Sequence, residues 1–149
     1  MRLDYTKVAP DGVKAFGGAH AYILQSGLED ELIEFVYLRV SQINGCAYCM
    51  DKHFRNLIRR GVSHACLALV QAWHEAGALF SEREKAALAW AESVTRVADT
   101  HVPDADFEAA AGVFSEKELA DLTMAISLMN AYNRLAISFR RAPDSARVA

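Results

Sequence analysis

Apolar residues recur along most of this chain at intervals of three and four, the spacing that places them on one face of an α-helix. Alternating apolar and polar runs of strand length are absent from the sequence. Capping and helix-stopping residues divide the periodic stretches into successive segments. The pattern therefore predicts an all-α fold of six or seven helices, at about residues 11–27, 30–42, 46–60, 63–77, 81–99, a short segment after Pro103, and 115–141.

Two of the predicted helices begin with a capping box. Ser81 with Glu84, and Ser115 with Glu118, have the spacing at which each side chain binds the other's backbone amide. The helix after Ser115 is apolar on almost every side, so we expect it at the centre of the fold or in a subunit interface. Beyond it, residues 142–149 are predicted to form a flexible tail.

The chain has 149 residues, of which 52% are hydrophobic and 23% charged, so we expect a single ordered domain over residues 1–149. Its net charge is -3 and its basic residues form no long run, which argues against binding to nucleic acid or an anionic membrane. No apolar stretch is long enough to span a membrane, and the first ten residues do not resemble a signal peptide. We therefore expect a cytoplasmic protein.

The most reactive side chains lie together between residues 34 and 53. Because successive helix residues turn by about 100°, Cys46, Cys49 and His53 would share one face of a helix within an arc of roughly 60°. If the Asn-Gly pair before Cys46 forms a tight antiparallel turn, Glu34 of the preceding helix would come level with His53. The spacing then places an acid, a base and a thiol next to one another.

Two thiols near the start of a helix suit redox chemistry, because the helix N-terminus and a nearby imidazole both lower a thiol pKa. A second thiol can convert a sulfenic acid into a disulfide. From the residues alone, the cysteines could instead be small buried side chains, or they could join His53 as three of the four ligands of a zinc site. Because no second Cys-x-x-Cys supplies a fourth ligand, we expect no metal, and we expect no organic cofactor.

The order of Glu34, Cys46, Cys49 and His53 resembles the signature of the AhpD-like alkylhydroperoxidases, within the carboxymuconolactone decarboxylase superfamily. The resemblance implies an AhpD-like helical bundle in which Glu34 and His53 form a proton relay. It also implies that Cys49 attacks the peroxide and Cys46 resolves the product. Physical reasoning leaves the attacking thiol open, since the helix N-terminus favours Cys46 whereas the imidazole favours Cys49.

Four further residues are candidate accessory groups. The best-known peroxidases of this family have histidine immediately before the second cysteine, where this chain has Tyr48, and a phenol with a pKa of about 10 is no base near neutral pH. His20 of the first helix could reach the site. Asn130 and Asn133 lie in a stretch that resembles the Asn-x-x-Asn-Arg stretch of smaller members, and as polar groups on an apolar helix they need partners.

The residues indicate thiol redox chemistry, and the resemblance implies a thiol-dependent peroxidase or disulfide reductase that acts on organic hydroperoxides. The resemblance implies an external dithiol reductant, either a protein or a lipoyl-type group, and a homo-oligomer that is a trimer, dimer or hexamer. Two alternatives stay open. One is an enzyme like gamma-carboxymuconolactone decarboxylase, which needs no redox pair; the other is a redox-sensing module whose disulfide changes a surface without turnover.

Overall fold

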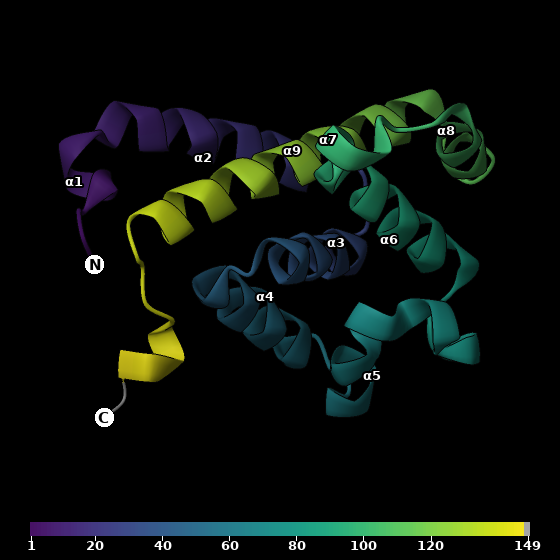
Figure 1. Cartoon of the computed structure of the whole chain (residues 1–149), viewed down its shortest axis with the longest axis horizontal. Helices are drawn as coiled ribbons and strands as arrows, with labels where there is room; N and C mark the ends of the chain where they lie inside the picture. Colours follow the sequence, from purple (N-terminus) through teal and green to yellow (C-terminus); the bar gives the residue numbers. More distant parts are fainter. Residues whose placement is uncertain (148–149) are drawn as a thin grey trace.

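Helix α3 (Asp30–Asn44) lies at the centre of the fold, surrounded by the other long helices (Figure 1). In the computed structural model, which describes residues 1–147, it packs against α4 (Ala47–Arg59), α6 (Glu82–Thr95) and α9 (Glu116–Ser138). Within those residues there are helices and turns but no strand, so the all-α prediction is confirmed. The expectation for the apolar last helix is also confirmed, because α9 packs against α3, α6 and three further helices.

The remaining helices close the bundle around this centre. Helix α2 runs beside α9, while α4 and α5 lie on the opposite side of α3 (Figure 1). Their bounds are α1 (Tyr5–Val8), α2 (Pro10–Leu24), α5 (His64–Leu69), α7 (Val97–Thr100) and α8 (Asp104–Ala111). Two apolar clusters result, one between α2, α3, α6 and α9 and the other between α3, α4 and α5. The first cluster contains both cysteines of the Cys-x-x-Cys pair.

The predicted helix over residues 63–77 is wrong in its second half. Ser63 caps its start as expected, but the α-helix ends at Leu69 and the chain continues as a 3-10 turn over Val70–Glu75. Within this turn the indole N–H of Trp73 donates to Glu92 of α6 at 2.9 Å. The local pattern carries no sign of this long-range bond, and the backbone of Ala72 beside it has non-helical angles, with φ -120° and ψ 30°.

Other predicted helix ends differ by smaller amounts. The first predicted helix, residues 11–27, occupies Pro10–Leu24, and α1 before it was not predicted. The predicted helix over 81–99 is interrupted at Arg96, after which α7 forms a single turn. Both capping boxes, at Ser81 and Ser115, are present as predicted.

The end of the chain folds back against α4. Asp144–Arg147 form a 3-10 turn in which Ser145 donates to Asp51, and Arg55 binds Asp144 at 3.1 Å. Residues 148–149 of the predicted tail lie outside the described part of the chain. The flexibility expected for residues 142–149 stays a prediction.

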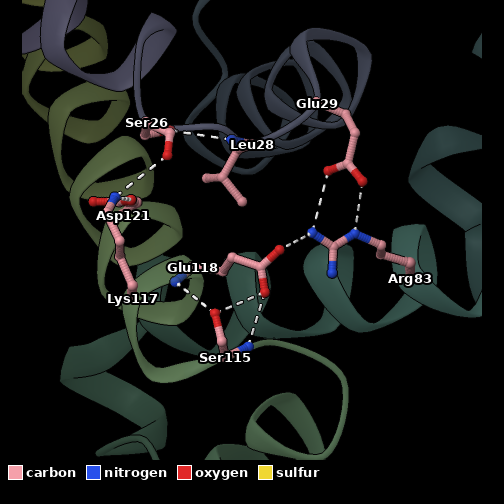
Figure 2. A network of polar contacts seen from close by, with 8 residues as sticks. All are labelled: Ser26, Leu28, Glu29, Arg83, Ser115, Lys117, Glu118 and Asp121. Carbon is pink, nitrogen blue, oxygen red and sulfur yellow. Dashed lines mark hydrogen bonds and ion pairs between the residues drawn. The ribbon is translucent and has the colours of Figure 1, made fainter.

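Arg83 of α6 ties together the starts of α3 and α9 (Figure 2). Its guanidinium donates to both oxygens of Glu29, at 2.9 and 3.2 Å, and to Glu118 at 2.6 Å. Glu118 also accepts from the backbone amide and the hydroxyl of Ser115. The bonds from Ser115 and from Arg83 lower the pKa of the Glu118 carboxyl from 4.5 to about 2.

This depressed pKa predicts how the stability of the fold depends on pH. The contribution of ionised Glu118 is fully present above pH 4.5 and is lost as the pH falls through about 2. Arg83→Met should lower the midpoint of thermal unfolding at pH 7 by a few degrees. The midpoint of this variant should also fall less than that of the wild type as the pH is lowered. Arg60→Met, which removes a single exposed pair with Asp30, is the matched control and should shift the midpoint less. Equal shifts in the two variants would contradict the role given to Arg83.

Candidate functional site

The turn between α3 and α4 is the tight antiparallel turn that the sequence argument required. Gly45 has a φ of 70°, a left-handed conformation that glycine adopts without strain, and the Cys46 amide donates back to Ser41. The Asn44 side chain donates to the oxygens of Asn130 and Asn133, both at 2.9 Å. These bonds hold the turn against α9 and set the register of α3 against α4.

The register brings Glu34 and His53 into contact. Nδ1 of His53 lies 2.7 Å from Oε2 of Glu34, and the side chain of Asn56 donates to the other carboxylate oxygen at 2.8 Å. Burial alone would raise the pKa of the Glu34 carboxyl, but the hydrogen bonds from His53 and Asn56 hold it below its ordinary value. When Glu34 accepts a proton from Nδ1, Nε2 is the ring nitrogen that is left to act as a base.

Asn56 was not singled out from the sequence. It lies three residues after His53, on the same face of α4, and that spacing was the one local signal that could have found it. Arg59 donates to Oδ1 of the Asn56 side chain, and Nδ2 of the same side chain donates to Glu34. The carboxylate is thus fixed by two donors.

The two thiols differ in acidity. Cys46 occupies the N-cap of α4, where its sulfur accepts the Cys49 amide at 3.4 Å. Hydrogen bonds from the thiol and amide of Cys49, with help from the nearby Asn133 amide, lower the pKa of Cys46 to about 7. The pKa of Cys49 is raised, first because its thiol donates to Cys46 and second because of burial. In the reduced pair Cys46 is therefore the more acidic thiol.

The two thiols also differ in access. Both are buried, with exposed fractions of 1% for Cys46 and 4% for Cys49, and neither is in a disulfide. A cavity of about 150 Å³ is lined by Cys49 and His53, but not by Cys46. Larger hollows of about 290 and 880 Å³ lie around Trp90, away from the cysteines. A small molecule that enters the cavity therefore meets Cys49 and not Cys46.

Three of the four accessory candidates lie at the cysteines or the cavity. Tyr48 and His20 line the cavity, and Asn133 is close enough to lower the pKa of Cys46. Burial raises the pKa of the Tyr48 phenol, so it stays protonated at neutral pH. Asn130 does not line the cavity; it binds Asn44 and Thr95 and so supports the turn.

One aromatic residue at the site was missed by the sequence argument. Tyr37 is fully buried, its ring centre lies 5.2 Å from that of His53 and 6.0 Å from that of His20, and its hydroxyl has no hydrogen-bond partner among residues 1–147. Burial raises the pKa of its phenol far above the ordinary value. The sequence offered no signal, because an apolar helix position is also a common place for a packed tyrosine.

Other predicted groups lie outside this site. Cys66 is buried in the cluster between α3, α4 and α5, where burial raises the pKa of its thiol.

In the described part of the chain, no three His, Cys, Asp or Glu side chains are grouped so as to hold a metal ion. No helix between residues 1 and 147 is long and apolar enough to cross a membrane.

Comparison with known proteins places this geometry in a family. The carboxymuconolactone decarboxylase family model matches residues 9–93. The uncharacterized protein YdfG of Bacillus subtilis is 32% identical over 138 residues, which cover 93% of each chain. A solved crystal structure is that of a protein of unknown function from Agrobacterium tumefaciens, described as a candidate AhpD antioxidant defence protein. Its sequence is 37% identical to this chain. It superposes with a TM-score of 0.91 over 95% of this chain and 97% of its own.

A more distant structure shares the fold alone. It is an uncharacterized peroxidase-related protein from Ralstonia eutropha, described as an alkylhydroperoxidase AhpD core. The two chains are 23% identical, with a TM-score of 0.82 over 95% of this chain and 75% of the other.

Proposed function

Because the chain belongs to the carboxymuconolactone decarboxylase family, with an AhpD-like fold, we propose that it is a thiol-dependent peroxidase that reduces organic hydroperoxides. One observation carries the proposal. The cavity that reaches Cys49 is also lined by His53. Nδ1 of this histidine lies 2.7 Å from Oε2 of Glu34. A base held by a carboxylate next to a thiol is one of the arrangements that activate a thiol as a nucleophile.

In the first step Nε2 of His53 accepts the proton of the Cys49 thiol. The Cys49 sulfur attacks the terminal oxygen of the hydroperoxide, a sulfur–oxygen bond forms, and the O–O bond breaks. The leaving alkoxide takes the proton from His53 and departs as an alcohol, while Cys49 becomes a sulfenic acid. Glu34 stays ionised throughout and stabilises the imidazolium that forms in between.

In the second step the Cys46 thiolate attacks the sulfur of the Cys49 sulfenic acid. The disulfide bond forms, the sulfur–oxygen bond breaks, and the departing hydroxide takes a proton from solvent and leaves as water. A pKa of about 7 suits this role, because a large share of Cys46 is already ionised at neutral pH. An external dithiol, on a protein or a lipoyl-type group, then supplies two electrons and two protons to restore both thiols.

Steady-state turnover tests this function. We expect the reduced protein to consume organic hydroperoxide continuously when a dithiol donor is present in excess, and to stop after one equivalent without it. A panel of dithiol donors should include small dithiols and lipoylated protein. Oxidation to the disulfide without turnover under every donor would instead favour a redox-sensing module, and no thiol oxidation at all would favour a decarboxylase-like enzyme.

We further propose that the protein forms a homo-oligomer. Phe107 of α8 and Met124 of α9 are 52% and 53% exposed and line the apolar hollow of about 880 Å³. Light scattering at micromolar concentration should give a multiple of the 16.4 kDa chain mass. A measured mass of one chain would contradict this proposal.

A further inference from the structure

The cavity beside Cys49 has basic side chains in its wall and no acidic one. Arg141 and Lys52 are among its twelve lining residues, which include no aspartate or glutamate. Neither cation makes an ion pair within residues 1–147. Asp144, a carboxylate whose charge acts on Arg141, is itself bound to Arg55 at 3.1 Å. The wall therefore carries two cations that are in no direct ion pair within residues 1–147, and Asp144 offsets part of the charge of Arg141 from a distance.

Arg141 is held in one orientation by its neighbours. Its Nη1 donates to the Tyr5 hydroxyl at 3.0 Å, and its guanidinium carbon lies 4.1 Å from the centre of the Tyr48 ring. Its backbone amide donates to Ala136 of α9 at 2.9 Å. The Nε and Nη2 groups bind nothing else in the described residues, so two donors of a fixed planar fork remain available. Such a fork matches the geometry of a carboxylate.

The size and remaining lining of the cavity restrict what it can hold. A volume of about 150 Å³ is below the roughly 300 Å³ at which drug-sized ligand pockets begin, so the occupant must be short. His20 also lines the cavity, and its Nδ1 is buried without a hydrogen-bond partner among residues 1–147. His20 therefore adds one polar group to the lining of the cavity.

From this arrangement we infer that the cavity selects short organic hydroperoxides that carry a carboxylate. Arg141 binds the carboxylate, Lys52 adds positive charge, and the hydroperoxide group at the other end faces the Cys49 sulfur. The inference rests on the proposed peroxidase function and narrows its substrate class from organic hydroperoxides in general to anionic ones.

Kinetics with a matched pair of substrates test the inference. A short hydroperoxide with a terminal carboxylate is compared with its methyl ester, which has the same chain without the charge. The wild-type protein should prefer the acid by about tenfold or more in kcat/KM, because a charge-assisted bidentate contact forms only with the acid. Arg141→Met should reduce this ratio to near one, and Arg141→Lys, which keeps the charge but loses the fork, should retain part of it.

Arg140→Met is the matched control, because it removes the same charge from the neighbouring exposed residue, which does not line the cavity. This control should keep the wild-type ratio of acid to ester. A wild-type ratio within twofold of one would overturn the inference. So would an unchanged preference in Arg141→Met.

Alkylation of Cys49 gives a second readout that does not depend on peroxidase activity. Iodoacetate and iodoacetamide are nearly the same size, but only the first is an anion. The ratio of their rates at Cys49, measured by mass spectrometry, should be higher in the wild-type protein than in Arg141→Met, and Arg140→Met should match the wild type. If no hydroperoxide reacts but this difference persists, the peroxidase proposal fails and the anion site stands. If hydroperoxides react but the alkylation ratios are equal in all three proteins, the anion site fails and the peroxidase stands.

Discussion

Cys49→Ser should abolish the reaction with hydroperoxide, whereas Cys46→Ser should still reduce one equivalent and then stop. The reason is access: Cys49 lines the cavity and Cys46 does not. A serine hydroxyl is no substitute for the attacking thiol, so the rate for Cys49→Ser should fall by about 10³-fold or more, to the background. In Cys46→Ser the sulfenic acid on Cys49 has no resolving partner, and a reagent specific for sulfenic acids should label it.

Cys66→Ser is the control for this pair of variants. Cys66 lies in the other apolar cluster, where burial raises its pKa, so its removal should leave peroxide consumption unchanged. The opposite pattern, a burst that survives in Cys49→Ser and disappears in Cys46→Ser, would show that acidity rather than access decides which thiol attacks.

Glu34→Gln and His53→Ala should each slow peroxide attack by about 10²- to 10⁴-fold, the range typical of general acid–base catalysis. The carboxylate and the imidazole are joined by a hydrogen bond of 2.7 Å and act on one proton, so their effects should not add. The double variant should be little slower than either single one. Rapid-mixing kinetics of the reduced proteins at pH 7 measure all three rates.

The pH dependence separates a role in proton transfer from a role in stability. Hydroxide can remove the Cys49 proton without a base, so the rates of both single variants should rise steadily with pH and should not level off near pH 9, because the pKa of Cys49 is raised. Glu31→Gln, which removes the same charge one turn earlier on α3, is the matched control and should react at the wild-type rate. Full activity of Glu34→Gln at pH 7 would show that the carboxylate is a structural partner only.

Local signals in the sequence were sufficient for much of the fold. The capping boxes at Ser81 and Ser115 marked two helix starts correctly, because both partners of each box lie within four residues. The contact between Glu34 and His53 was also predictable, since a rise of about 1.5 Å per residue on both sides of one turn makes them level. That argument depended on Gly45, whose left-handed conformation produces the turn.

Long-range contacts set the limit of what the sequence could predict. The α-helix ends at Leu69 in a segment whose Trp73 binds Glu92, nineteen residues away. Arg141 lines the cavity and donates a hydrogen bond to the hydroxyl of Tyr5, near the other end of the chain. The residues around Trp73 and Arg141 show no sequence pattern that indicates a contact with Glu92 or Tyr5. These two contacts are therefore visible only in the folded structure.

The central claim is that Cys46 and Cys49 form one redox pair, and mapping the oxidised protein tests it most directly. The reduced protein is treated with one equivalent of organic hydroperoxide, the remaining thiols are alkylated, and peptides are identified by mass spectrometry. The account predicts that the peptide with Cys46 and Cys49 loses two hydrogens through an internal disulfide, while Cys66 is alkylated as a free thiol. A bridge that includes Cys66, or alkylation of all three cysteines after the peroxide is added, would contradict it.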